Sequence, residues 1–147
     1  MIRFTFWRYW LLVACVSMIA LGLLMVFFNQ HPLFVSINKP IHKVFWPSYE
    51  MTPAIIDFQR WVYGTWGATI AAMGIFAVFL AQKGFSQREK WARDCLGASI
   101  LVWYVLDTTV SLLGGVVANA TFNTVCLVGF ALPLLFTWRD FGYGHTD

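Results

Sequence analysis

The sequence predicts an all-α integral membrane protein, a four-transmembrane-helix bundle with a short interfacial helix in its first, outer loop. Hydrophobic residues make up 59% of the 147 residues, and charged residues make up only 12%. Because soluble domains carry about 25% charged residues, this chain has too few charges to cover a water-exposed surface. Four stretches approach the roughly 20 apolar residues that a helix needs to cross a bilayer. The composition therefore argues against a soluble enzyme and against a nucleic-acid-binding domain.

The four predicted spans form one membrane domain that covers residues 1–147. They lie at 10–28, 54–82, 94–113 and 119–138, with an outer loop at 29–52 and a cytoplasmic loop at 83–93. The first apolar run is longer than the apolar core of a signal peptide, which has about 7–15 residues. We therefore expect the first span to be retained.

Local signals mark the ends of these helices. Thr52 followed by Pro53 is typical of an N-cap with proline at the first helical position, so the second long helix should begin there. Gly114 and Gly115 indicate a tight turn between the third and fourth spans. Pro133 should kink the fourth span unless a neighbouring group satisfies the carbonyl that it leaves without a partner.

Lysine and arginine predict the orientation. Seven cations lie in the N-terminal segment, the loop at 83–93 and the C-terminal tail, whereas the other side carries only Lys39, Lys43 and Arg60. By the positive-inside rule, both termini should face the cytoplasm, and we expect a bacterial-type inner membrane. This bias explains the net charge of +3 without a nucleic-acid partner.

The outer loop has the pattern of a helix that lies on the membrane surface. Asn38 can cap a helix that begins at Lys39 and Pro40 and stops before Pro47. Ile41, Val44 and Phe45 would form the apolar face of this helix. The polar face would be formed by Lys39, His42 and Lys43.

Small residues on the second span predict a helix-packing seam. Gly64, Gly67, Ala71 and Gly74 follow one helical stripe. Small side chains at this spacing allow helices to approach closely inside a membrane.

Asp107 is an acidic residue inside a predicted span, and it defines the candidate site. It lies about 9 Å from the outer end of the third helix at 1.5 Å per residue, where an unpaired carboxylate costs several kcal/mol. Because Arg60 is the nearest plausible cation, we predict an Arg60–Asp107 contact, either directly or through water. The candidate ligand-binding residues converge on this layer: Arg60, Tyr63, Trp103, Asp107, Ser111, Asn119 and Asn123.

Several functions fit this pattern. The leading hypothesis is the binding of a lipid-like or small amphipathic ligand in a polar pocket of the outer half of the bundle. One alternative is an enzyme of the isomerase or hydratase type that uses Asp107 as general acid or base. Further alternatives are a small transporter that works as a homodimer, or an accessory subunit whose partner is a larger membrane complex. An ion pair at Asp107 could also serve only to fix helix register.

Redox and metal chemistry have little support in the sequence. Cys15, Cys95 and Cys126 are far apart, and no histidine lies in a span, because His31, His42 and His145 fall outside them. We therefore expect no metal and no cofactor. Six of the eight tryptophans lie at span ends, as interfacial anchors do, which leaves Trp66 and Trp103 as candidates to line an interior.

Overall fold

A computed structural model describes residues 2–48 and 51–141, so His145 lies outside the described residues. Its long helices are α1 (Ile2–Phe28), α3 (Pro53–Leu80), α4 (Lys90–Leu113) and α5 (Val117–Phe136), and α2 (Pro32–Phe45) is shorter. A π-helical turn, η1 (Ala81–Phe85), continues α3, and a 3-10 turn, η2 (Trp138–Phe141), follows α5. The described part of the chain is all-helical and contains no strand. As an integral membrane protein requires, four of its helices are long and apolar enough to cross a membrane.

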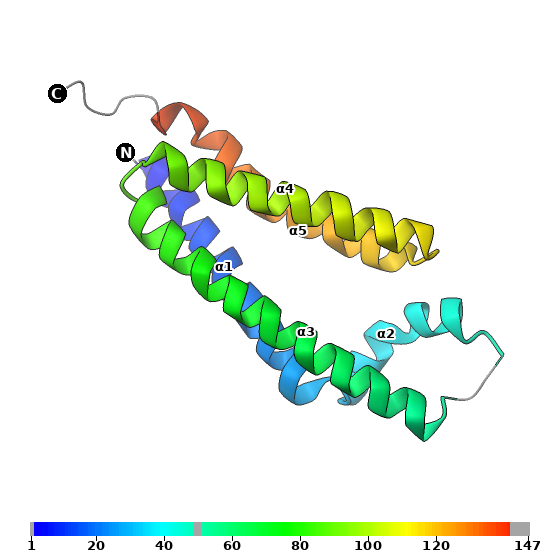
Figure 1. Ribbon diagram of the computed structural model, residues 1–147. Helices are drawn as coiled ribbons and strands as arrows, with labels where there is room; N and C mark the ends of the chain where they lie inside the picture. Colours follow the sequence, from blue (N-terminus) through cyan, green and yellow to red (C-terminus); the bar gives the residue numbers. More distant parts are fainter. Residues whose placement is uncertain (1, 49–50, 142–147) are drawn as a thin grey trace.

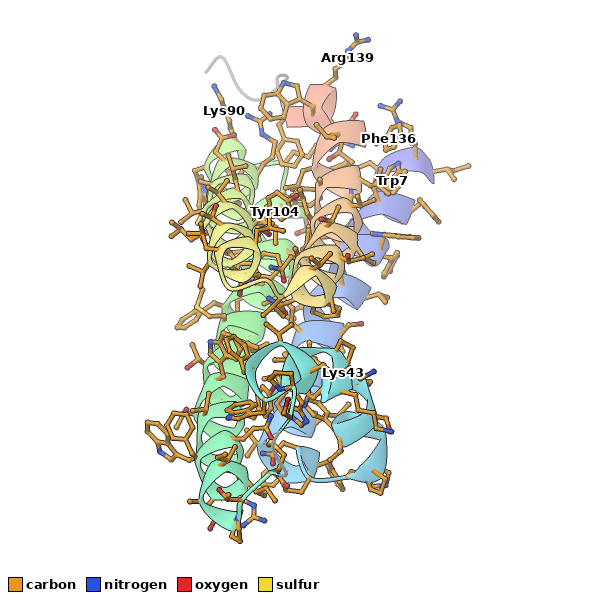
Figure 2. The ribbon with its side chains drawn as sticks, turned by 90° about the vertical axis from the view of Figure 1, so that its right-hand side faces the viewer. Trp7, Lys43, Lys90, Tyr104, Phe136 and Arg139 are labelled. Carbon is orange, nitrogen blue, oxygen red and sulfur yellow. The ribbon has the colours of Figure 1, made fainter. Side chains whose placement is uncertain are left out.

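The helices form two antiparallel pairs that meet at one end and diverge toward the other (Figure 1). Helix α1 packs along α3, and α4 packs along α5. The pairs meet where α1 begins, where η1 leads into α4 and where α5 ends; we call this the shared end. Lys90 and Arg139 lie at the shared end, whereas Lys43 of α2 lies toward the opposite end (Figure 2).

Glycines bring α1 and α3 into close contact. A Cβ atom at Gly67 would lie 2.5 Å from the carbonyl oxygen of Gly22, and one at Gly22 would lie 2.5 Å from the backbone nitrogen of Ala71. Gly67, Ala71 and Gly74 are all buried. In contrast, a Cβ atom at Gly64 would meet nothing within 4 Å. The seam predicted on the second span therefore begins at Gly67, one turn later than expected.

The predicted signals at two helix ends are confirmed. Thr52 has an extended backbone, and its Oγ1 accepts a hydrogen bond from the backbone N–H of Ile55 at 3.4 Å, with Pro53 opening α3. Gly114 caps α4, and Gly115 has a φ of 73°. An L side chain rarely adopts this φ, so glycine suits the tight turn between α4 and α5.

Helix α2 begins earlier than predicted. It starts at Pro32, and Pro40 lies inside it, so Asn38 is a buried residue of the helix and not its cap. Either proline could open a helix, because φ is preset and the first N–H needs no partner. Pro40 lacks the N–H that would bond to the carbonyl of Ser36, and Ser36 is exposed, so solvent can take the place of that donor. The end of the helix, just before Trp46 and Pro47, agrees with the prediction.

Helix α2 touches both pairs at their diverging end. His42 accepts a hydrogen bond from the side-chain amide of Gln59 on α3, with 2.7 Å between the two Nε2 atoms. Val44 and Phe45 lie beside the turn formed by Gly114 and Gly115. Helix α2 therefore bridges α3 and the α4–α5 turn.

Aromatic rings fill the core of the shared end. Phe4 of α1 stacks on Phe85 at 5.7 Å between ring centroids, and Phe85 contacts Phe141 at 4.9 Å. Leu11 and Phe85 are fully buried. Farther along, large apolar side chains face outward on every long helix, for example Val16, Phe76, Val105 and Val125.

Candidate functional site

Asp107 of α4 lies at the centre of a polar cluster between α4 and α5. Its Oδ1 accepts hydrogen bonds from the side-chain amides of Asn119 and Asn123, each at 2.8 Å, and from the Ser111 hydroxyl at 3.2 Å. The amide of Asn119 also donates to Ser111 Oγ at 2.8 Å, and the amide of Asn123 donates to Thr108 Oγ1 at 3.3 Å. We call these five residues the Asp107 cluster.

Helical spacing and the tight turn assemble the cluster. Asp107 and Ser111 are four residues apart on α4, and Asn119 and Asn123 are four apart on α5, so each pair shares a helical face. The turn at Gly114 and Gly115 folds the two faces together. Asn123 is only 2% exposed and Ser111 is 8% exposed, whereas Asp107 and Asn119 are half-buried. Each helix therefore contributes one buried member, Ser111 on α4 and Asn123 on α5, and one half-buried member, Asp107 on α4 and Asn119 on α5.

The carboxylate is bonded unequally. Oδ1 takes three donors, while no hydrogen bond or ion pair from the part of the chain that the structure describes reaches Oδ2. A carboxylate oxygen only accepts, so Oδ2 remains free to accept a donor from another molecule.

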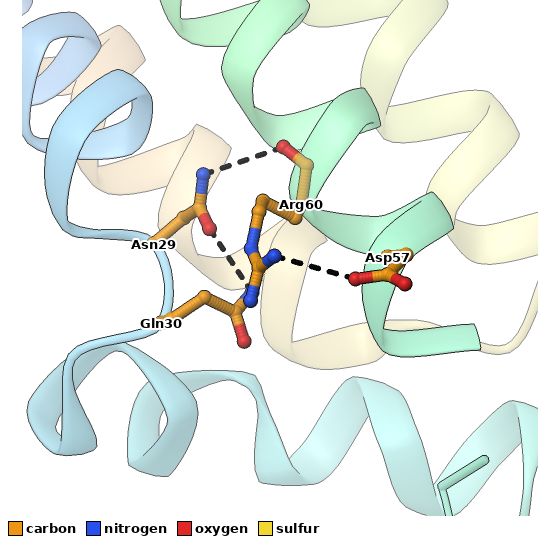
Figure 3. A network of polar contacts seen from close by, with 4 residues as sticks. All are labelled: Asn29, Gln30, Asp57 and Arg60. Atoms are coloured by element: carbon orange, nitrogen blue, oxygen red, sulfur yellow. Dashed lines mark hydrogen bonds and ion pairs between the residues drawn. The ribbon is translucent and has the colours of Figure 1, made fainter. Parts of the chain in front are cut away.

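Arg60 does not belong to the Asp107 cluster, and the predicted Arg60–Asp107 contact is wrong. Arg60 Nη1 lies 3.3 Å from Asp57 Oδ1, one turn away on the same helix. The backbone carbonyl of Arg60 accepts a long hydrogen bond, 3.4 Å, from the side chain of Asn29 (Figure 3). Both side chains of the Asp57–Arg60 pair are mostly exposed, so this pair contributes little to stability.

The physical reason is a difference in depth. At about 1.5 Å of rise per residue, Arg60 lies about 38 Å along α3 from Phe85, whereas Asp107 lies about 26 Å along α4 from Lys90. Since Phe85 and Lys90 both lie at the shared end, Arg60 extends about 12 Å beyond the level of Asp107. The two pairs also diverge in that direction (Figure 1). The prediction assumed that the outer ends of all spans are level.

The remaining predicted residues lie elsewhere. Tyr63 contacts Phe34 of α2 edge-to-face, with 5.8 Å between ring centroids, and so belongs to the α2–α3 contact. Trp103 is half-buried on α4, one turn from Asp107. Trp66, the second tryptophan expected to line an interior, is 50% exposed. The structure thus brings together Asp107, Ser111, Asn119 and Asn123, and leaves Arg60 and Tyr63 on the other helix pair.

A second polar group, missed by the sequence analysis, surrounds Arg60 (Figure 3). Asn29 is 5% exposed, its amide donates to the Met25 carbonyl at 2.7 Å, and its Oδ1 accepts from Gln30 at 3.0 Å. A cavity of about 400 Å³ lies here, lined by residues 26–31 and Arg60. The signal in the sequence was the polar pair Asn29-Gln30 directly after an apolar span.

The Asp107 cluster can offer a ligand the acceptor oxygens of a carboxylate and of side-chain amides. Within residues 2–48 and 51–141, no three His, Cys, Asp or Glu side chains are grouped so that they could hold a metal ion. Comparison with known proteins adds nothing to this geometry, because no family model, curated protein or solved structure matches the chain.

Proposed function

We propose that this protein is an integral membrane protein that binds a lipid-like or small amphipathic molecule, with the polar head of that molecule at the Asp107 cluster. Four apolar helices with outward-facing large side chains support the membrane setting. The half-buried carboxylate between two of them supports the site, because ionisable residues are rare within membrane spans and mark binding or transport positions. Trp103, one turn along α4, would pack against the apolar body of the ligand.

The single observation that carries the proposal is the unequal bonding of Asp107. A carboxylate that served only to join α4 and α5 would gain from bonding both oxygens to the protein, since an unsatisfied charged group is costly in an apolar medium. Here three donors converge on Oδ1 and none from the described residues reaches Oδ2. A ligand head group would supply the missing donor.

The proposal is tested by comparing the lipids that stay bound to the wild-type protein and to its variants during purification. We expect mass spectrometry to find an amphiphile that co-purifies with the wild-type protein and is lost from the Asp107→Asn variant, which keeps the size of the side chain but removes its charge. Asp57→Asn is the matched control, because Asp57 is also a helical carboxylate but is 70% exposed and lies outside the cluster. This control should retain the wild-type lipid.

The same experiment separates binding from a purely structural role. If Asp107→Asn lowers the stability of the protein but keeps the wild-type set of lipids, the cluster only joins two helices and the proposal is wrong.

We also propose that both termini face the cytoplasm of a bacterial-type inner membrane. The support is the gathering of cations at the shared end, where Lys90 and Arg139 lie (Figure 2), together with the positive-inside rule. A reporter that fluoresces only in the cytoplasm should be bright when it is fused to the C-terminus. A dark fusion that is nevertheless inserted would reverse the orientation.

A further inference from the structure

We infer that the head group held at Asp107 is a primary ammonium group, an inference that rests on the function proposed above. First, the N–H donors of the two asparagine side chains are already bonded to acceptors within the Asp107 cluster. The Asn119 amide donates to Asp107 Oδ1 and Ser111 Oγ, both at 2.8 Å. The Asn123 amide donates to Asp107 Oδ1 at 2.8 Å and Thr108 Oγ1 at 3.3 Å. Each side-chain amide has two N–H donors, so neither has a donor left for a ligand.

The second step concerns the direction of the amide oxygens. Because Asp107 Oδ1 can only accept, both asparagines must turn their nitrogens toward it, and their Oδ1 atoms turn away. By standard bond lengths an amide oxygen lies about 2.3 Å from its own nitrogen, so each of the two amide oxygens lies within about 5 Å of Asp107 Oδ1. Asn119 is half-buried like Asp107, whereas Asn123 is only 2% exposed, so we assign the Asn119 oxygen and Asp107 Oδ2 as the two acceptors of the ligand.

The third step concerns charge. The cation expected to balance Asp107 lies about 12 Å beyond its level and is paired with Asp57 at 3.3 Å. An anionic head group would meet a carboxylate and amide oxygens, which repel it. A primary ammonium group carries three N–H donors and a positive charge, and a charge-assisted bond to a carboxylate is stronger than a neutral one. The amine of a phospholipid, a long-chain amine and a small soluble amine share this chemistry.

The inference can be tested residue by residue with nuclear magnetic resonance, because the chain has few asparagines. They are Asn29, Asn38, Asn119 and Asn123. With ¹⁵N labelling of the asparagine side chains, the intact protein in micelles gives four pairs of NH₂ signals, one pair for each asparagine. Asn119 and Asn123 report on the cluster, while Asn29 and Asn38 lie in and beside α2 and serve as internal controls. The probes are dodecylamine, dodecanol and dodecanoate, which share one chain and differ in head group, and ethylamine, which has the head group alone.

We expect dodecylamine to shift the signals of Asn119 and Asn123 saturably and to leave those of Asn29 and Asn38 in place. Dodecanol and dodecanoate should bind about tenfold more weakly or not at all, a difference that one charge-assisted bond can supply. The Asp107→Gln variant should lose the saturable shift, and Asp57→Gln should keep it. The wild-type comparison of probes needs no variant, so the inference stays testable even if Asp107→Gln fails to fold.

The outcomes separate the two proposals. If dodecanol or dodecanoate shifts the Asn119 and Asn123 signals as strongly as dodecylamine, the site binds amphiphiles but the ammonium inference is wrong. If ethylamine binds as tightly as dodecylamine, the ammonium inference stands and the amphipathic ligand of the proposed function is replaced by a small amine. If no probe shifts these signals and no lipid depends on Asp107, both proposals are wrong.

Discussion

The indole Nε1 of Trp10 on α1 donates a 2.9 Å hydrogen bond to the backbone carbonyl of Gly129 on α5. This carbonyl is four residues before Pro133, which lacks the N–H that would normally bond to it. A membrane interior has no bulk water to take the place of that donor, so a neighbouring helix is one of the few sources of a partner. Trp10 is one of the six tryptophans at the ends of the predicted spans, and its hydrogen bond completes the backbone of a neighbouring helix.

The Trp10→Phe substitution should therefore destabilise the protein by about 1 kcal/mol, the usual net value of one hydrogen bond. The same substitution should also be made in the Pro133→Ala variant, in which the N–H of residue 133 can bond to the Gly129 carbonyl. In that background Trp10→Phe should cost much less, and a double-mutant cycle measures the difference. Unfolding in mixed micelles provides the free energies. Equal costs in the two backgrounds would mean that the hydrogen bond does not compensate for the proline.

The glycine seam between α1 and α3 gives a second prediction, with a control from the same stripe. A Cβ atom at Gly67 would lie 2.5 Å from the Gly22 carbonyl oxygen and 2.7 Å from Met25 Cβ, so Gly67→Ala must push the helices apart. We expect a loss of about 2 kcal/mol, which is typical of overpacking.

Gly64→Ala is the control for this loss. A Cβ atom at Gly64 meets nothing within 4 Å, and alanine favours a helix over glycine by about 1 kcal/mol, so stability should be unchanged or higher. The same unfolding assay measures both variants. A similar loss for Gly64→Ala and Gly67→Ala would mean that close contact along α1 is not the cause.

The parts of the fold that follow from short stretches of sequence could be predicted. Apolar length indicates the spans, Thr52 and Pro53 mark the start of α3, and Gly114-Gly115 marks a turn. The grouping of Asp107 with Asn119 and Asn123 follows from the same turn, because it places two i,i+4 faces opposite one another. Such features depend on residues close together in the chain.

The errors arose where distant segments decide the geometry. Apolar runs did not reveal that α3 extends far beyond the α4–α5 turn, so Arg60 was placed level with Asp107. Two prolines could each start the helix in the outer loop, and the sequence alone did not select Pro32 over Pro40. Arg93 was counted only as a cation of the cytoplasmic loop, because its burial depends on η2, which follows it by more than 40 residues in the chain.

Arg93 gives the third prediction. It is 5% exposed, bonds to Asp94 Oδ1 through Nε at 2.9 Å and Nη2 at 2.6 Å, and donates to the Trp138 carbonyl at 3.3 Å. Its guanidinium lies 3.7 Å from the centre of the Trp138 ring. A lysine cannot reproduce the paired bonds or the planar stacking.

Arg93→Lys should therefore loosen η2 and cost about 2 kcal/mol, in the range for hydrogen bonds to charged groups. Amide hydrogen exchange at Trp138–Phe141 should accelerate, while exchange in the glycine seam should not change. Lys90→Arg is the control, since Lys90 is exposed at the same end. Unchanged exchange at η2 in the Arg93→Lys variant would show that the aromatic contacts of Phe141 hold this segment without the arginine.

The fourth prediction concerns the coupling of α4 to α5 through Asn123. Asn123→Leu preserves approximate size but removes a donor from Asp107 Oδ1 and from Thr108, so the buried side of the carboxylate loses a partner. We expect a loss of about 2 kcal/mol, because an unsatisfied charged acceptor adds its desolvation penalty to the lost bond. In an Asp107→Leu background the same substitution should cost far less, since no carboxylate is left without its donor.

Thr121→Val is the control on the same helix, because the Thr121 hydroxyl is exposed and bonds only to the carbonyl of Val117 one turn earlier. If Asn123→Leu costs the same with and without Asp107, the two helices are held by packing alone and the amide bonds of the cluster do not couple them.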